Sequence, residues 1–335
     1  MGVGPVGQNG QVSGLGIVFA GTPAVAVPSL ELLVAAGHDV RQVITRPDAP
    51  LGRKRILTPS PVAEAATRVG IDVVKAARLG DEVSTAVATA QPDLGVVVAY
   101  GGLVREPLLS MPRLGWINLH FSLLPAWRGA APVQWSLIRG DTEVGAAVFQ
   151  LVPELDAGAV FATMREPNDG VATAGDLLER FSHSGAQLLR SVVDQLADGT
   201  AVATPQPIAG VSLAPKLSRD DGCLVWTRDH AEVLNRFRGV TPEPGAWTTL
   251  QGSVVKVLAA AASDADLRLA PGELLGERAR VLVGTAGHPI ELRTVQPAGK
   301  SAMSAADWAR GLGGQPLRFD AGEHHNQGAD RHGVN

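Results

Sequence analysis

An asparagine and a histidine two positions apart are the residues of this sequence best suited to chemistry. Asn118 and His120 end an apolar stretch, and Asp156 follows later in a Leu-Asp-Ala-Gly segment. In an extended strand alternate side chains share a face, so Asn118 and His120 are expected to point the same way. An amide donor can stabilise an oxyanion, and a histidine with a carboxylate nearby can move a proton. The three residues together suit acyl transfer. A lone Asn-x-His pair usually only makes hydrogen bonds to the backbone of a loop.

The residues after this pair narrow the interpretation. A Ser-Leu-Leu-Pro segment follows Phe121, directly after the pair, and the turn Trp127-Arg128-Gly129 comes next. With the later Leu-Asp-x-Gly segment, they resemble the folate-dependent formyltransferases. The resemblance implies that Asn118, His120 and Asp156 are the catalytic residues. It also implies that a loop of four residues contacts the folate: Ser122, Leu123, Leu124 and Pro125. Phe121 stands where this family often has glycine, and we expect it to reshape the rim of that loop.

The resemblance further implies a reaction. The formyl group would come from 10-formyltetrahydrofolate as co-substrate and pass to an amine. Asn118 would donate to the tetrahedral oxyanion, His120 would shuttle a proton, and Asp156 would orient His120. No metal is expected, because a formyl group on N10 is already activated and the histidines form no His-Glu-x-x-His pattern. The single cysteine, Cys223, excludes an internal disulfide and a cysteine zinc site.

The elements that must position these residues alternate between strands and helices. The sequence predicts strands at 15–20, 40–45, 72–74, 94–99, 116–120, 144–151 and 158–164. It predicts helices at 25–36, 63–69, 81–90, 133–139 and 174–197, the first of them capped by Thr22. This alternation is typical of an α/β fold with a doubly wound, mostly parallel, Rossmann-like sheet. The first turn lacks Gly-x-Gly-x-x-Gly, which argues against a nicotinamide cofactor.

From about Ser212 the alternation of strands and helices gives way to short strands broken by turns. Short strands are predicted at 223–227, 246–250, 253–259, 280–284 and 290–296, with one helix at 230–238. Several short strands with one helix predict a small β-barrel of the oligonucleotide-binding type, an OB-like domain. We therefore expect five parts: a disordered extension over 1–14, a formyltransferase catalytic domain over 15–199, a linker over 200–211, a C-terminal β-barrel tRNA-binding domain over 212–320 and a disordered tail over 321–335.

Two parts of the chain make the resemblance more specific. The long insertion at 46–61 and C-terminal motifs such as Pro244-Gly245-Ala246-Trp247 are similar to the branch of the family that formylates methionyl-tRNA. This implies that methionyl initiator tRNA is the acceptor, for translation initiation. The insertion at 46–61 is long for a connection between a strand and a helix, and such long connections are usually functional or disordered. We expect the insertion to hold the acceptor end of the tRNA through its basic residues: Arg46, Arg53, Lys54 and Arg55.

Composition sets the class of protein. The chain has 335 residues, of which 45% are hydrophobic and 19% charged, as in soluble globular proteins. Its net charge of -4 gives no global attraction to nucleic acid, so contacts with RNA must come from local patches. The longest apolar run, around 94–104, is too short to span a bilayer, and the first residues do not resemble a signal peptide. We expect a cytoplasmic enzyme without a membrane partner, and a monomer.

Two other functions remain open from the sequence. The same catalytic core could serve a folate-dependent formyltransferase or hydrolase with a small-molecule acceptor, but such an enzyme would lack or replace the part after residue 212. A non-catalytic RNA-binding protein would rely on the barrel alone. The presence of Asn118, His120 and Asp156 together argues against that second alternative.

Overall fold

The computed structural model describes residues 14–52, 54–277, 279–313 and 317–320. The chain divides into two compact units. Unit 1 comprises Met1–Arg128, Gly145–Arg165 and Glu179–Ser212, and unit 2 comprises Gly129–Val144, Glu166–Leu178 and Leu213–Asn335. The predicted terminal extensions lie outside the described residues, apart from Gly14. Because the two units interleave along the chain, the linear domain boundaries remain a prediction.

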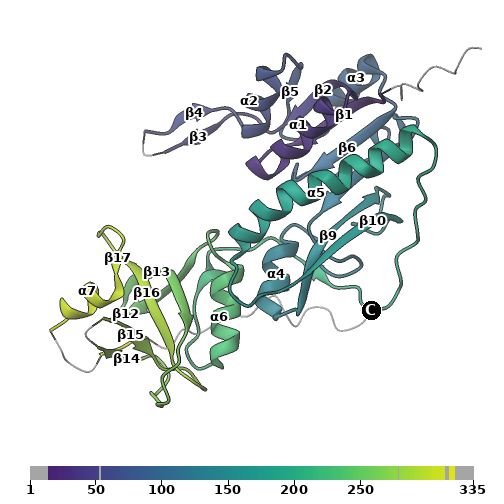
Figure 1. Ribbon diagram of the computed structural model, residues 1–335. Coiled ribbons are helices and arrows are strands. Elements are labelled where there is room, and N and C mark those ends of the chain that lie inside the picture. The colour runs from purple at the N-terminus through teal and green to yellow at the C-terminus, as the bar shows by residue number, and fades with distance from the viewer. Residues whose placement is uncertain (1–13, 53, 278, 314–316, 321–335) are drawn as a thin grey trace, which may run out of the picture. The chain divides into compact units, whose positions relative to one another are not determined.

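The core of unit 1 is a seven-stranded sheet in the order β10-β9-β7-β6-β1-β2-β5 (Figure 1). The strands are β1 (Gly16–Gly21), β2 (Asp39–Thr45), β5 (Val73–Lys75), β6 (Leu94–Val98), β7 (Trp116–His120), β9 (Glu143–Gln150) and β10 (Val160–Pro167). Neighbouring strands from β5 to β7 are parallel, and β9 is antiparallel to β7. All residues of β1 and β6 are buried, as expected for parallel strands covered on both faces. The predicted doubly wound, mostly parallel sheet is confirmed.

Helices cover both faces of this sheet. They are α1 (Val27–Ala35), α2 (Pro61–Arg68), α3 (Asp81–Ala90) and α5 (Ala174–Ala197). Val18 of β1 shares a buried cluster with Val83 of α3. On the other face α5 approaches β7 closely, since a Cβ added at Gly185 would lie 3.1 Å from the Leu119 side chain. Figure 1 shows α5 running across the sheet in front of β6.

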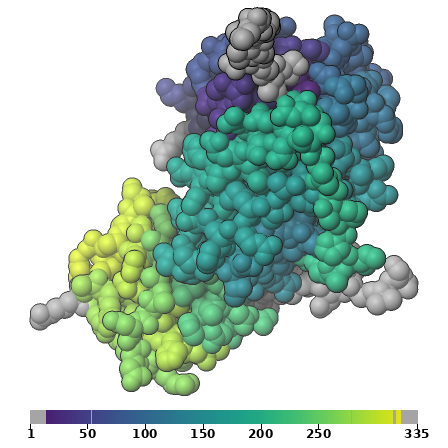
Figure 2. Space-filling model, turned by 45° about the vertical axis from the view of Figure 1, so that its right-hand side comes forward, coloured from purple at the N-terminus to yellow at the C-terminus, as the bar shows by residue number. Residues whose placement is uncertain are grey.

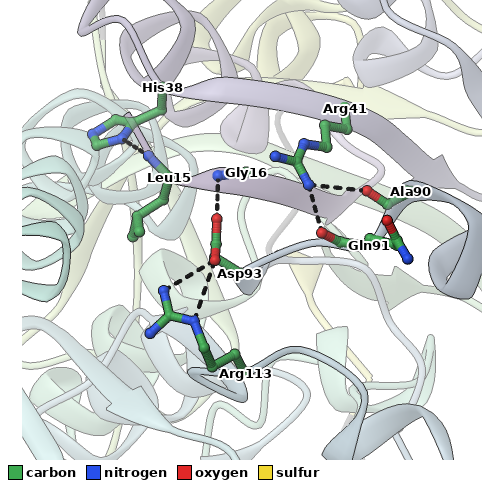
Figure 3. A network of polar contacts seen from close by, with 8 residues as sticks. All are labelled: Leu15, Gly16, His38, Arg41, Ala90, Gln91, Asp93 and Arg113. Carbon is green, nitrogen blue, oxygen red and sulfur yellow. Dashed lines mark hydrogen bonds and ion pairs between the residues drawn. The ribbon is translucent and has the colours of Figure 1, made fainter. Parts of the chain in front are cut away.

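The start of β1 is fastened by side chains from distant segments (Figure 3). Asp93 accepts hydrogen bonds from the Gly16 N–H at 2.9 Å and from Arg113 Nη2 at 3.0 Å. These donors lower the pKa of the Asp93 carboxyl. His38 Nδ1 accepts from the Leu15 N–H, and its Nε2 lies 3.0 Å from Asp194 Oδ1 of α5. The teal surface of α5 accordingly lies beside the purple N-terminal segment (Figure 2).

One local prediction for unit 1 is wrong. The first helical turn is a 3-10 helix, η1 (Ala24–Ala26), preceded by Pro23, so Thr22 is not its cap. The insertion after β2 also contains an unpredicted antiparallel hairpin, formed by β3 (Ala49–Leu51) and β4 (Ile56–Thr58). Its strands are only three residues long, too short for alternation to show in the sequence. Ser60 caps the following helix, accepting from the Ala63 N–H at 3.1 Å.

Unit 2 contains a second seven-stranded sheet, ordered β12-β13-β16-β15-β14-β18, with β17 beside β16. The strands are β12 (Ala246–Leu250), β13 (Ser253–Ala262), β14 (Glu273–Gly276), β15 (Val281–Val283), β16 (Ile290–Pro297), β17 (Met303–Ser304) and β18 (Leu317–Arg318). The pairs are antiparallel. The Asp320 N–H donates to the Thr249 carbonyl at 2.9 Å, which ties the end of β18 back to β12. The sheet thus curls into a half-barrel, and the predicted fold class is confirmed.

The core of unit 2 rests on aromatic side chains and closely packed helices. The Phe319 ring stacks between Trp226 and Trp308, at centroid distances of 5.2 and 5.9 Å. The helices are α4 (Pro132–Arg139), α6 (His230–Gly239) and α7 (Ala305–Arg310). Helix α4 lies against α6 so closely that a Cβ on Gly239 would meet the Gln134 carbonyl at 2.6 Å.

One predicted strand of this unit, 223–227, is wrong. Cys223 forms only an isolated bridge with Trp247, and the residues after it enter the core through their side chains. The elements absent from the prediction for this unit are short: β11 (Leu213–Ala214), the 3-10 helix η3 (Asp220–Gly222), β14, β17, α7 and β18.

Candidate active site

The sheet presents Asn118 and His120 on one face of β7, as predicted. The strand pairs Asn118 with Val97 of β6 on one side and with Phe149 of β9 on the other. The intervening Leu119 faces α5, so the two polar side chains point to the opposite face. Asn118 is half-buried and His120 is buried. Both lie near the carboxyl end of a parallel strand, where ligands bind in open α/β sheets.

The His120 ring makes a hydrogen bond through one nitrogen, faces a carboxylate with the other and packs against an aromatic ring. Nε2 lies 2.9 Å from the Trp127 carbonyl oxygen. Because a carbonyl can only accept, Nε2 carries a proton and donates it, which leaves Nδ1 with the lone pair in the neutral ring. Nδ1 faces Asp156 Oδ2 at 3.9 Å. The Phe149 ring packs edge-on against the imidazole at a centroid distance of 6.1 Å.

Burial sets the charge of His120. Removal from water lowers its pKa below the ordinary histidine value, while the Asp156 charge and the Trp127 carbonyl oppose that shift. The direction is downward because burial penalises the charged imidazolium. His120 is therefore neutral near pH 7, with its Nδ1 lone pair available to take a proton.

Asp156 reaches His120 from a tight turn after β9. Its backbone is left-handed, with φ of 46°, which is uncommon for a residue other than glycine. Two positions on, a Cβ at Gly158 would lie 1.7 Å from the Gln150 carbonyl, so only glycine fits there. The separation of 3.9 Å between carboxylate and imidazole exceeds a direct hydrogen bond. A group that carries hydrogens can bridge the two acceptors.

The predicted folate loop follows β7 directly. Ser122 is buried, and its hydroxyl donates to the Ala126 carbonyl at 2.7 Å, so it closes the loop from within. Leu123, Leu124 and Pro125 are half-buried. Phe121 is buried, and its ring lies 3.5 Å from a Cβ built on Gly185 of α5. The Phe121 ring thus packs inward against the helix, and its effect on the rim of this loop stays a prediction.

The predicted tRNA-binding cations fall into two groups. The Arg46 guanidinium donates to backbone carbonyls of Ala77, Tyr100 and Gly101, at 2.7 Å to Ala77 and 3.5 Å to Tyr100. It also lies over the Tyr100 ring. Lys54 and Arg55, at the tip of the β3–β4 hairpin, are exposed. Arg53 lies outside the described residues. The structure brings Asn118, His120 and Asp156 together, whereas Arg46 belongs to the base of the hairpin.

Comparison with known proteins places the chain in a family. The formyl transferase model matches residues 16–193, and the model of the formyl transferase C-terminal domain matches residues 216–313. A methionyl-tRNA formyltransferase of Leifsonia xyli subsp. xyli is 60% identical over 301 residues, covering 90% of this chain and 99% of that protein. The chain belongs to the methionyl-tRNA formyltransferase family. The predicted family and the predicted enzyme class, a formyltransferase, are confirmed.

Other relatives agree with this membership. A methionyl-tRNA formyltransferase of Arthrobacter sp. is 55% identical, covering 88% of this chain and 96% of that protein. A Helicobacter canadensis N-formyltransferase, solved with folinic acid and dTDP-3-aminofucose, has a TM-score of 0.64 at 16% identity, covering 84% of this chain and 99% of that one. HypX from Aquifex aeolicus with tetrahydrofolic acid has a TM-score of 0.61 at 18% identity, covering 90% and 47%. These structures show a shared fold.

Two kinds of feature are absent from the described residues. Within 14–52, 54–277, 279–313 and 317–320, no helix is long and apolar enough to cross a membrane. In the same residues no three His, Cys, Asp or Glu side chains gather so as to hold a metal ion.

Proposed function

We propose that this protein transfers the formyl group of 10-formyltetrahydrofolate to the α-amino group of methionyl initiator tRNA, with Asn118, His120 and Asp156 as its catalytic residues. The observation that carries the proposal is the pair of acceptors formed by His120 Nδ1 and Asp156 Oδ2, 3.9 Å apart. A substrate amine held between them can donate to both. It is then poised to lose a proton as its nitrogen becomes bonded to carbon.

The proposed reaction begins when the amine nitrogen attacks the formyl carbon and the carbonyl π electrons move to oxygen. Asn118, on the same face of β7 as His120, donates a hydrogen bond to that oxyanion. The proton released by the amine goes to His120 Nδ1, where Asp156 stabilises the resulting imidazolium. When the oxyanion collapses, the carbon–N10 bond breaks, N10 takes up the proton held by His120, and the imidazole returns to its neutral form.

The residues around this pair fit a folate carrying the formyl group. Leu123, Leu124 and Pro125 are half-buried apolar side chains beside β7, suited to the apolar face of a planar ring system. Ser122 supports them by closing the loop on the Ala126 carbonyl. The role of Ser122 in this proposal is thus to shape the loop.

The β3–β4 hairpin is the proposed contact for the tRNA acceptor end. It presents Lys54 and Arg55 to solvent, and its strands expose large apolar side chains. Arg53 adds a third positive charge to the sequence of the tip. Arg46 holds the base of the hairpin through its bonds to backbone carbonyls. The proposal includes action in the cytoplasm, as a monomer, in translation initiation.

One assay tests this function. The purified protein is supplied with 10-formyltetrahydrofolate and one acceptor at a time: methionyl initiator tRNA, methionyl elongator tRNA, a small primary amine or water. We expect formyl transfer to the initiator tRNA only. Transfer to a small amine, or formate release in water at a similar rate, would establish the small-acceptor alternative instead. Absence of any reaction, with His120→Ala as the background, would remove the catalytic proposal.

A further inference from the structure

The connection after α5 comprises the predicted linker, 200–211, and Ser212, and it contacts the two segments that flank His120. On one flank, Ser212 Oγ accepts from the Trp127 N–H at 2.9 Å, and the Ser212 carbonyl accepts from the Arg128 N–H at 2.9 Å. The Trp127 carbonyl in turn accepts from His120 Nε2. On the other flank, Gln206 contacts the turn that carries Asp156.

Gln206 makes four hydrogen bonds through one amide. Its Nε2 donates to the carbonyls of Asp156 and Gly158, both at 2.8 Å. Its Oε1 accepts from Arg128, at 3.2 Å from Nε and 2.7 Å from Nη2. A guanidinium has only donors, so the oxygen of the amide must face Arg128 and the NH₂ must face the turn. Arg128 therefore fixes which way the Gln206 amide points.

The turn at 156–158 needs support from other residues because its backbone is constrained at two positions. Asp156 adopts a left-handed backbone that an L residue with a side chain disfavours, and Gly158 is pressed against the Gln150 carbonyl. The two bonds from Gln206 fall on the carbonyls of these same two residues. Without them, the turn can relax toward the commoner right-handed conformation, which would swing the Asp156 side chain away from the imidazole.

We infer that Gln206, oriented by Arg128, is a positioning residue that holds the Asp156 carboxylate opposite His120 Nδ1. Gln206 touches neither the imidazole nor the proposed oxyanion site in this arrangement; it acts through the turn. The inference rests on the proposed function, since it assigns Gln206 a role in proton transfer by the His120–Asp156 pair.

Gln206→Glu tests this role while keeping part of the structure. A carboxylate at 206 can still accept from Arg128, but it cannot donate to the Asp156 and Gly158 carbonyls. Asn168→Asp is a matched control in unit 2. There the Asn168 Nδ2 donates to the Asp141 carbonyl at 2.7 Å and Oδ1 accepts from Arg238 at 3.1 Å. Both variants turn an amide between an arginine and a backbone carbonyl into a carboxylate.

The first readout separates kcat from KM. For Gln206→Glu we expect kcat to fall about tenfold or more, because small misplacements of catalytic groups have effects of that size. The KM values for methionyl-tRNA and formyl-folate should stay within about twofold, as expected when an interaction made only in the transition state is removed. Asn168→Asp should keep wild-type kcat. A Gln206→Glu variant with wild-type kcat would overturn the inference.

The second readout is the pH profile of Gln206→Ala, which adds no charge. If the Asp156 carboxylate moves away, the acid limb of kcat should shift to lower pH, as it should in Asp156→Asn, and the double variant should shift no further. A reduced kcat with an unmoved acid limb would assign Gln206 a merely structural role. His120→Ala, run alongside, separates the outcomes: if it stays active, the proposed catalytic site fails; if it is inactive while both Gln206 variants behave as wild type, only this inference fails.

Discussion

The His120 site and the β3–β4 hairpin lie in the same unit but differ in how their polar groups are partnered. His120 is buried, with a carbonyl on one nitrogen and a carboxylate near the other. Lys54 and Arg55 are exposed at the hairpin tip. Proton transfer needs groups held within fractions of an ångström, whereas phosphate contacts tolerate mobile cations. The difference supports the proposed roles of the two regions: a reaction at the buried site and binding of a large anion at the exposed hairpin.

The largest loss of activity is expected from substitutions in the buried site. Asn118→Ala and His120→Ala should each lower kcat by about a hundredfold or more, since the first removes the proposed oxyanion donor and the second the proposed proton-transfer group. Binding of formyl-folate should persist, because the loop at 122–125 is untouched. Single-turnover formylation of methionyl-tRNA measures the first effect and folate titration the second. Near-normal rates in both folded variants would sink the assignment.

Asp156→Asn should be about as damaging as the histidine change. The amide cannot stabilise an imidazolium, although its size preserves the turn. Groups that act as one unit lose most of their joint effect at the first removal. The Asp156→Asn, His120→Ala double variant should therefore be scarcely slower than either single variant. Reductions in kcat that simply multiply would mean that the two residues act independently.

A third prediction concerns the dependence of kcat on pH. Burial lowers the pKa of His120, and the Asp156 charge partly restores it. In the proposed mechanism neutral His120 is the base, so kcat should fall on the acid side of the ordinary histidine value near 6.5. Removing the Asp156 charge lowers that pKa further, so the acid limb of Asp156→Asn should lie at lower pH than in wild type. Measuring kcat from acid to neutral pH in both proteins checks the direction, and a shift to higher pH would contradict it.

The same pKa has a consequence for stability. The unfolded chain, with an ordinary histidine, binds the proton more readily than the folded one. Stability is therefore lost as the pH falls from about 6.5 toward the lower folded pKa, and it is retained above that range. His120→Phe, if it folds, should lose less stability across this window, as urea titrations at a series of pH values would show.

Much of the fold could be predicted from the sequence, for physical reasons. Strand β7, helices α3 and α5 and strand β12 begin and end at the predicted residues. These elements have apolar runs or helical periodicity long enough to set their bounds. The β3–β4 hairpin strands and β14, β17 and β18 have at most four residues each, and so little periodicity that only their pairing partners define them.

The candidate site could be predicted only in part. Asn118 and His120 share a strand, so the period of two places them together. The contacts of Gln206 join residues 48 to 78 positions apart, and no local pattern marks them. For Arg46 the sequence shows the charge but not its partners. Its charge matches that of the other loop cations, but its donors bind backbone carbonyls, which the sequence could not reveal.

The smallest expected effect concerns the exposed region. Replacing Arg53, Lys54 and Arg55 by alanine should reduce kcat/KM for methionyl-tRNA and flatten its dependence on salt. Each phosphate that the hairpin no longer neutralises removes about 0.7–0.9 from the slope of log K against log salt, because fewer counterions are released. Formyl-folate binding should not change, since the proposed folate loop, 122–125, lies elsewhere in the unit. Arg68→Ala is a control, because this exposed cation of α2 already pairs with Glu31 at 3.0 Å. If the triple variant keeps the wild-type slope and efficiency, the hairpin does not hold the tRNA and the contrast between the two regions loses its functional meaning.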